Sequence, residues 1–121
     1  VRVPVATVLL EEIGFRGVLW AQVTRLRGTT WATAVSSALF ALWHVVPATR
    51  LTHANVTVGY LAGVLGVTAT VVTALVASGL AGAFLCELRR RSDSLLAPIG
   101  LHLATNTFAY LAAFGAARFL D

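Results

Sequence analysis

Polar residues interrupt the apolar stretches of this chain, and their types and spacing could support hydrolysis. Glu11, Glu12 and Arg16 lie within one apolar run, and Glu12 precedes Arg16 by four residues. On a helix this is the favourable order for an ion pair, whereas Glu11 points about 100° away and has no local partner. A carboxylate without a partner in a low-dielectric site accepts a proton more readily near neutral pH. Glu11 is therefore a candidate general base, and Glu12 with Arg16 a candidate structural pair.

The other polar groups within apolar runs are His44, His102 and Asn106. His102 and Asn106 are four residues apart and share one helix face, while His44 follows Phe40 by four residues. A carboxylate and an imidazole can activate water, and His and Asn side chains can donate hydrogen bonds to an oxyanion. Taken singly, each histidine is more simply explained as a buried core residue. A zinc site of Glu and two His is an alternative, which no His-Glu-x-x-His motif supports.

The composition is that of a membrane protein. The 121-residue chain is 58% hydrophobic and 12% charged, whereas soluble domains carry about 25% charged residues. All nine basic residues are Arg and lie at the ends of apolar runs, not in the basic stripes typical of nucleic-acid binding. Cys86 is the only cysteine, which excludes an internal disulfide and a cysteine-based metal cluster. We therefore expect a multi-pass protein of the cell membrane, surrounded by lipid, with no nucleic-acid partner.

About four spanning helices are predicted, over residues 3–24, 29–46, about 63–87 and 95–119. Pro47 is expected to end the second helix, and residues 48–55 to form a polar loop. Residues 56–63 are expected to form a loop or a short interfacial helix, with one tilted or kinked helix over 56–88 as the competing interpretation. Residues 92–94 are expected to form a turn with capping residues. Strands are not expected, because the apolar runs do not alternate with period two.

Alternating crossings would place five arginines on one side of the membrane and three on the other. The first group is Arg25, Arg27, Arg89, Arg90 and Arg91, and the second is Arg2, Arg50 and Arg118. The excess favours the first side as cytoplasmic.

The predicted helices bring the polar residues to similar depths. Counted from the arginine-rich side, Glu12, His44, His102 and Asn106 lie between roughly 12 and 23 Å deep, near the bilayer centre. Three unpaired ionisable residues in lipid would cost about 7–10 kcal/mol. Polar groups from three helices can instead share one hydrated space. The sequence thus predicts an all-α, multi-pass transmembrane bundle around a polar intramembrane cavity.

The three motifs, taken in order, resemble those of a known family. Glu11-Glu12-x-x-x-Arg16, Phe40-x-x-x-His44 and His102-x-x-x-Asn106 match the motifs of the CPBP family. This family, also called ABI, comprises CAAX-prenyl-protease-2-like and bacteriocin-processing intramembrane proteases. Residues 94–99 also resemble the approach to the family's last motif. The resemblance covers residues 11 to about 113, and three motifs in order on separate segments are specific.

The resemblance implies an intramembrane endopeptidase that acts on membrane-associated proteins or peptides. By the family's motifs, Glu11 and His44 would activate the attacking water, and His102 and Asn106 would stabilise the oxyanion. Glu12 and Arg16 would orient the site. No cofactor is expected, but family members are often described as metalloproteases, so zinc or another divalent metal stays an alternative.

Other functions stay open at this stage. One is a non-catalytic membrane immunity or partner-binding protein of the same fold. Another is a proton or ion carrier, since buried Glu and His also form relays. The carrier lacks support from a broken-helix inverted repeat. Ser36 and Ser37 do not suggest a serine hydrolase, because no Gly-x-Ser-x-Gly context accompanies them. Residues 1–121 are expected to form a single core domain of a longer membrane protein, because the chain begins at Val1.

Overall fold

The computed structural model describes the backbone of residues 2–120 and the side chains of residues 5–55 and 57–118. No strand occurs in this part of the chain, so the all-α prediction is confirmed. The elements are α1 (Arg2–Glu11), the π-helix η1 (Glu12–Leu19), α2 (Trp20–Arg27), α3 (Thr29–Trp43), α4 (Val45–Ala54), α5 (Val56–Leu65), α6 (Val67–Ser92) and α7 (Leu96–Leu120).

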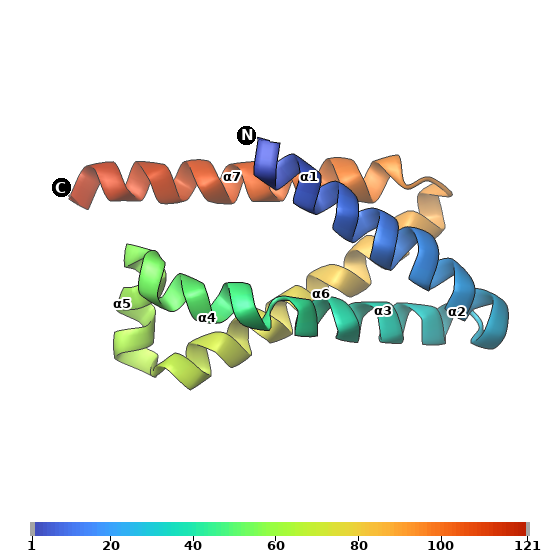
Figure 1. Ribbon diagram of the computed structural model, residues 1–121, viewed down its shortest axis with the longest axis horizontal. Helices are drawn as coiled ribbons and strands as arrows, with labels where there is room; N and C mark the ends of the chain where they lie inside the picture. Colours follow the sequence, from blue (N-terminus) through green and yellow to red (C-terminus); the bar gives the residue numbers. More distant parts are fainter. Residues whose placement is uncertain (1, 121) are drawn as a thin grey trace.

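The helices form an open bundle (Figure 1). The path α1–η1–α2 leads to a tight turn at Gly28, after which α3 and α4 run back. α6 packs along α3, which is the most extensive helix pair, and α7 then returns past α6 and α1. Two of the turns are made by glycines with positive φ, Gly28 at +85° and Gly66 at +87°. Glycine adopts this conformation without a Cβ penalty, so both positions end a helix sharply.

The second helix ends three residues earlier than predicted, at Trp43. Pro47 is the cause, because it has no N–H for the carbonyl of Trp43 and its ring would collide with that carbonyl in a continuous helix. At the break, the His44 N–H donates to Ala41 O (3.0 Å), and the Ala48 N–H donates to His44 O (2.8 Å). His44 therefore lies in a kink between two helices.

The prediction of a polar loop over residues 48–55 is wrong, because most of this segment belongs to α4. Two of its threonines bond to their own helix. Thr49 Oγ1 donates to Val45 O (3.1 Å), and Thr52 Oγ1 donates to Thr49 O (2.7 Å). Proline is tolerated in a first helical turn, so α4 can begin around Pro47 once α3 has ended.

The ends of the later helices follow from local chemistry. The short-helix interpretation of residues 56–63 is confirmed as α5, and the chain breaks at Gly66 before α6. α6 extends past the predicted end near Glu87, and in this last part Arg90 and Arg91 both pair with Glu87 (2.7 and 2.6 Å). The turn predicted at residues 92–94 lies one residue later, at 93–95, because Ser92 still belongs to α6, and Ser94 Oγ accepts from the Leu96 N–H (3.1 Å).

By length and composition, two stretches of the described chain are candidate membrane spans, Thr29–Ala54 and Val67–Ser92. The path α1–η1–α2 contains the charged residues of the first motif, and α7 contains His102 and Asn106. The number of four spanning helices stays a prediction.

Candidate active site

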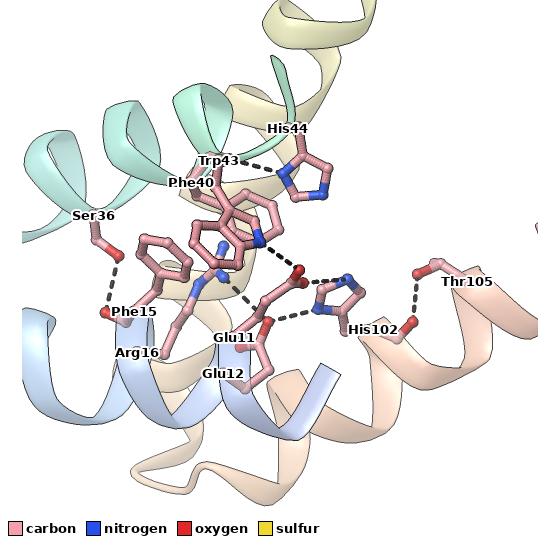
Figure 2. A network of polar contacts seen from close by, with 10 residues as sticks. All are labelled: Glu11, Glu12, Phe15, Arg16, Ser36, Phe40, Trp43, His44, His102 and Thr105. Atoms are coloured by element: carbon pink, nitrogen blue, oxygen red, sulfur yellow. Dashed lines mark hydrogen bonds and ion pairs between the residues drawn. The ribbon is translucent and has the colours of Figure 1, made fainter. Parts of the chain in front are cut away.

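The π-helix η1 carries a buried ion pair on the side that faces α7 (Figure 2). Arg16 Nη1 lies 3.1 Å from Glu12 Oε1, and both side chains are 0% exposed. The i, i+4 pair expected from the sequence is therefore present. Without a partner, either charge would be strongly destabilising at such a site.

His102 extends from α7 between the two carboxylates. Its Nδ1 lies 2.7 Å from Glu12 Oε1, and its Nε2 lies 3.7 Å from Glu11 Oε2. An ionised carboxylate only accepts hydrogen bonds, so the Nδ1 of His102 donates to the arginine-paired Glu12. The second nitrogen is then the one directed at Glu11.

Glu11 is not the unpartnered carboxylate that helical spacing suggested. It is 5% exposed, and its Oε1 accepts a hydrogen bond from Trp43 Nε1 at 2.9 Å. Helical spacing reveals only partners on the same helix and therefore did not predict Trp43. Two features of the sequence pointed to Trp43. It directly precedes His44, and its indole carries one N–H donor, which usually has a partner when it is buried.

The π-helical geometry accompanies this convergence of two consecutive carboxylates on one imidazole. Bonds from i to i+5 place more residues in each turn, so successive side chains are separated by a smaller angle than on an α-helix. Ser36 supports the distortion from α3, because its Oγ donates to Phe15 O at 2.9 Å. Phe15 O also accepts from the Trp20 N–H in the π pattern. Such π-helical turns occur frequently at functional sites.

Phe40 is the apolar centre of the site and is 2% exposed. The Arg16 guanidinium lies 4.0 Å from its ring centroid, close enough for a cation–π interaction. Its ring centroid also lies 4.4 Å from that of His44 and 5.7 Å from that of His102. One phenyl ring therefore lies against both histidines and the cation.

His44 occupies the kink between α3 and α4, with φ −85° and ψ 0°, a backbone region in which many active-site residues lie. Its Nδ1 is 2.8 Å from Phe40 O. Because a carbonyl only accepts, Nδ1 carries the hydrogen, and Nε2 of the neutral ring is an acceptor. Figure 2 shows the rings of His44 and His102 extending from their helices toward the Glu11 carboxylate.

A cavity of about 560 Å³ lies beside these rings, between α3, α6 and α7. Its lining combines the polar site residues with a mostly apolar wall: Phe40, His44, Ala77, Ser78, Ala81, Phe84, Leu85, Leu101, His102, Thr105 and Asn106. The cavity brings His44 and His102 together with Asn106, whose side chain is exposed. Glu11 reaches this group through His102.

The side chains do not fit a metal centre. In the described part of the chain, no group of three or more His, Cys, Asp or Glu residues is arranged to hold an ion. Catalytic zinc usually has three protein ligands at about 2.0–2.2 Å. Here Glu12 Oε1 is occupied by Arg16 and His102, and the imidazole of His102 bonds to Glu12 through Nδ1.

Comparison with known proteins identifies the family. The family model for type II CAAX prenyl endopeptidases, Rce1-like, matches residues 1–108, which include all three motifs. The chain belongs to this family. The resemblance to the CPBP family is thereby confirmed, and the family is one of membrane-embedded proteases. No similar curated protein and no similar solved structure was found.

Proposed function

We propose that this protein is an intramembrane endopeptidase that hydrolyses peptide bonds of membrane-associated proteins or peptides. The observation that carries the proposal is the buried His102, held by Glu12 and facing Glu11, on the wall of a cavity that His44 and Asn106 also line. Three helices supply an acceptor carboxylate, two imidazoles and a carboxamide to one place. This is the inventory that water-mediated acyl transfer requires.

In the proposed mechanism, a water in the cavity attacks the scissile carbonyl. Glu11 Oε2 and His44 Nε2 are the acceptors available to take its proton, since the other atom of each group is engaged by Trp43 and by Phe40 O. The new C–O bond produces an oxyanion, which Asn106 and His102 stabilise by donating hydrogen bonds. Nε2 of His102 donates when it carries a proton. In the resting arrangement it lies 3.7 Å from Glu11 Oε2, so the two groups must approach each other before the proton that Glu11 took from the water can pass to Nε2. The proton finally passes to the leaving amine as the C–N bond breaks.

Glu12 and Arg16 have the orienting role in this proposal. Glu12 accepts from His102 Nδ1 and thereby directs Nε2 at the reacting atoms. Arg16 Nη1 contacts the same oxygen of Glu12 as His102 does, and its guanidinium lies over Phe40. Substitution of either residue should therefore disturb the fold as well as the chemistry.

The first prediction concerns Glu11→Gln, which keeps the shape of the side chain and its contact with Trp43 but removes the proton acceptor. We expect proteolysis to fall by at least about 10²- to 10⁴-fold, the usual contribution of a general base. The measurement is cleavage of a pool of lipidated and transmembrane peptides in proteoliposomes, read by mass spectrometry, with and without a chelator.

Glu87→Gln is the matched control, because Glu87 lies near the end of α6 and pairs with Arg90 and Arg91 outside the site. It should cleave at the wild-type rate. Full activity of Glu11→Gln would contradict the role of Glu11 as the base, whereas no cleavage by the wild type would favour a non-catalytic partner-binding protein. Loss of wild-type activity in chelator, restored by zinc, would contradict the metal-free mechanism.

A further inference from the structure

We propose that Trp43 is a positioning residue for Glu11. Its indole N–H fixes one carboxylate oxygen and leaves the other as the proton-accepting atom. The role assigned to Trp43 rests on the proposed function, since it specifies how the general base of that reaction is held.

The direction of the Trp43–Glu11 bond is unambiguous. An indole has one donor and no acceptor, so Nε1 donates and Oε1 of Glu11 accepts at 2.9 Å. Hydrogen bonds to an ionised carboxylate are roughly twice as strong as neutral ones. Because Glu11 is almost fully buried, few water molecules compete for Oε1. The bond therefore restricts rotation of the carboxylate about its last torsion.

The two oxygens of Glu11 consequently have different surroundings. Oε1 is held by Trp43, whereas Oε2 lies 3.7 Å from Nε2 of His102. A general base must present its acceptor atom at hydrogen-bond distance from the proton that it removes. Trp43 thus selects Oε2 and keeps it on the side of the carboxylate that faces the histidine.

The ring of Trp43 is itself held in place. Its centroid lies 6.2 Å from that of Phe15, in an edge-to-face arrangement, and Phe15 packs in the same way on Phe40 at 5.5 Å. Trp43 is the last residue of α3, directly before the kink at His44. The same helix end therefore delivers a hydrogen-bond donor to Glu11 and an imidazole acceptor to the cavity.

A different role for Trp43 would be that of a membrane-interface anchor, because Trp is enriched at the bilayer surface. Its residue surface is 53% exposed, which fits contact of the ring with lipid. An anchor, however, directs its N–H toward the polar interface. Here the N–H is directed inward and donates to the buried carboxylate of Glu11. The arrangement is therefore that of a hydrogen-bond donor to the site and not that of an interface anchor.

The test compares Trp43→Phe with Trp31→Phe in proteoliposomes. Phenylalanine keeps an aromatic ring against Phe15 but has no N–H donor. We expect kcat of Trp43→Phe to fall roughly 10- to 100-fold, the value of a lost hydrogen bond to a charged group, with KM within about twofold. Trp31, exposed near the start of α3, should be replaceable without loss. A rise in KM with unchanged kcat would overturn the proposal.

A second variant protects the test against a packing artefact. Replacing Trp43 with β-(3-benzothienyl)alanine keeps the bicyclic ring and substitutes sulfur for the N–H group. It should lose as much kcat as Trp43→Phe. Full activity of this variant would show that ring packing, and not the hydrogen bond, matters.

Ultraviolet resonance Raman spectroscopy separates the failure of this proposal from the failure of the proposed function. The indole N–H band of Trp43, isolated as the difference between wild type and Trp43→Phe, should shift toward a weaker hydrogen bond in Glu11→Leu. This readout needs no turnover. An unchanged band would overturn the contact itself, whereas a shifted band in a protein without any proteolysis would support the contact and reject the proposed function.

Discussion

Two helical paths of similar length, α1–η1–α2 and α6, differ in the kind of side chain that they expose. α6 presents large apolar side chains outward, with Val76, Leu80 and Phe84 57–69% exposed. The path α1–η1–α2 instead carries three ionisable groups at its centre, and none is more than 5% exposed. The three central charges of the first path face inward, whereas Arg25 and Arg27 at its end are exposed. The central charges therefore belong to the site and do not describe the outer surface of this path.

The two paths also differ in backbone geometry. α6 is a continuous α-helix that approaches α3 closely at Gly82, where a Cβ would lie 3.2 Å from Phe40 Cδ1 and from Ser37 Cα. The first path widens into a π-helix over Glu12–Leu19. A regular helix is sufficient to pack against a neighbour, whereas the convergence of two adjacent carboxylates on one imidazole coincides with an irregular one.

The largest effect on stability is expected from Arg16→Met. This substitution removes a buried charge from α1–η1–α2 and makes that path more like the apolar α6. The substitution leaves Glu12 buried with only His102 as a partner. We expect the free energy of unfolding to fall by about 3–5 kcal/mol, as for other broken buried ion pairs. Denaturant unfolding in detergent micelles measures this change. Arg91→Met, at an exposed position on α6, is the control and should stay within about 0.5 kcal/mol of wild type. An equal effect of both substitutions would remove the contrast between the two paths.

A medium effect is expected where α6 meets α3. Gly82→Ala places a methyl group against the Phe40 ring and the α3 backbone, and overpacking of this kind typically costs about 1–3 kcal/mol. The higher helix propensity of alanine offsets part of that cost. Gly79→Ala is the matched control on the same helix, because its Cβ would make an ordinary contact with Ala41 Cβ at 3.6 Å. Thermal unfolding should show a lower midpoint for Gly82→Ala and an unchanged or higher one for Gly79→Ala; the reverse order would contradict the packing described.

The smallest effect is expected at the support of the π-helix. Ser36→Ala removes a hydrogen bond to Phe15 O and should cost about 0.5–1.5 kcal/mol. Ser37→Ala is the neighbouring control, since the buried Ser37 Oγ has no hydrogen-bond partner among the described residues. It should be neutral or slightly stabilising. If unfolding experiments gave both variants the same stability, Ser36 would not support η1.

Helical periodicity predicted the contacts within single helices. The Glu12–Arg16 pair and the all-α architecture follow from spacing and composition, and the three motifs placed the chain in its family. The kink at His44 was predictable only in part, because Pro47 signals a break without showing that a helix resumes. The Trp43–Glu11 bond joins residues 32 apart in the sequence, and no periodicity within one helix connects them. The roles of Glu11, His44, His102 and Asn106 in catalysis stay predictions.

The π-helix also implies a particular response to a change in chain length. A helix with i to i+5 bonds accommodates its sequence as though one residue had been inserted into an α-helix. Deleting a single residue from η1 would restore regular α-helical bonding and leave α1 and α2 close to their present orientation, because the wider turn had absorbed the extra residue. Successive side chains would then be separated by about 100° again, so Glu11 and Glu12 would diverge. A one-residue deletion in this segment should therefore be tolerated by the fold while it separates the two carboxylates that now converge on His102.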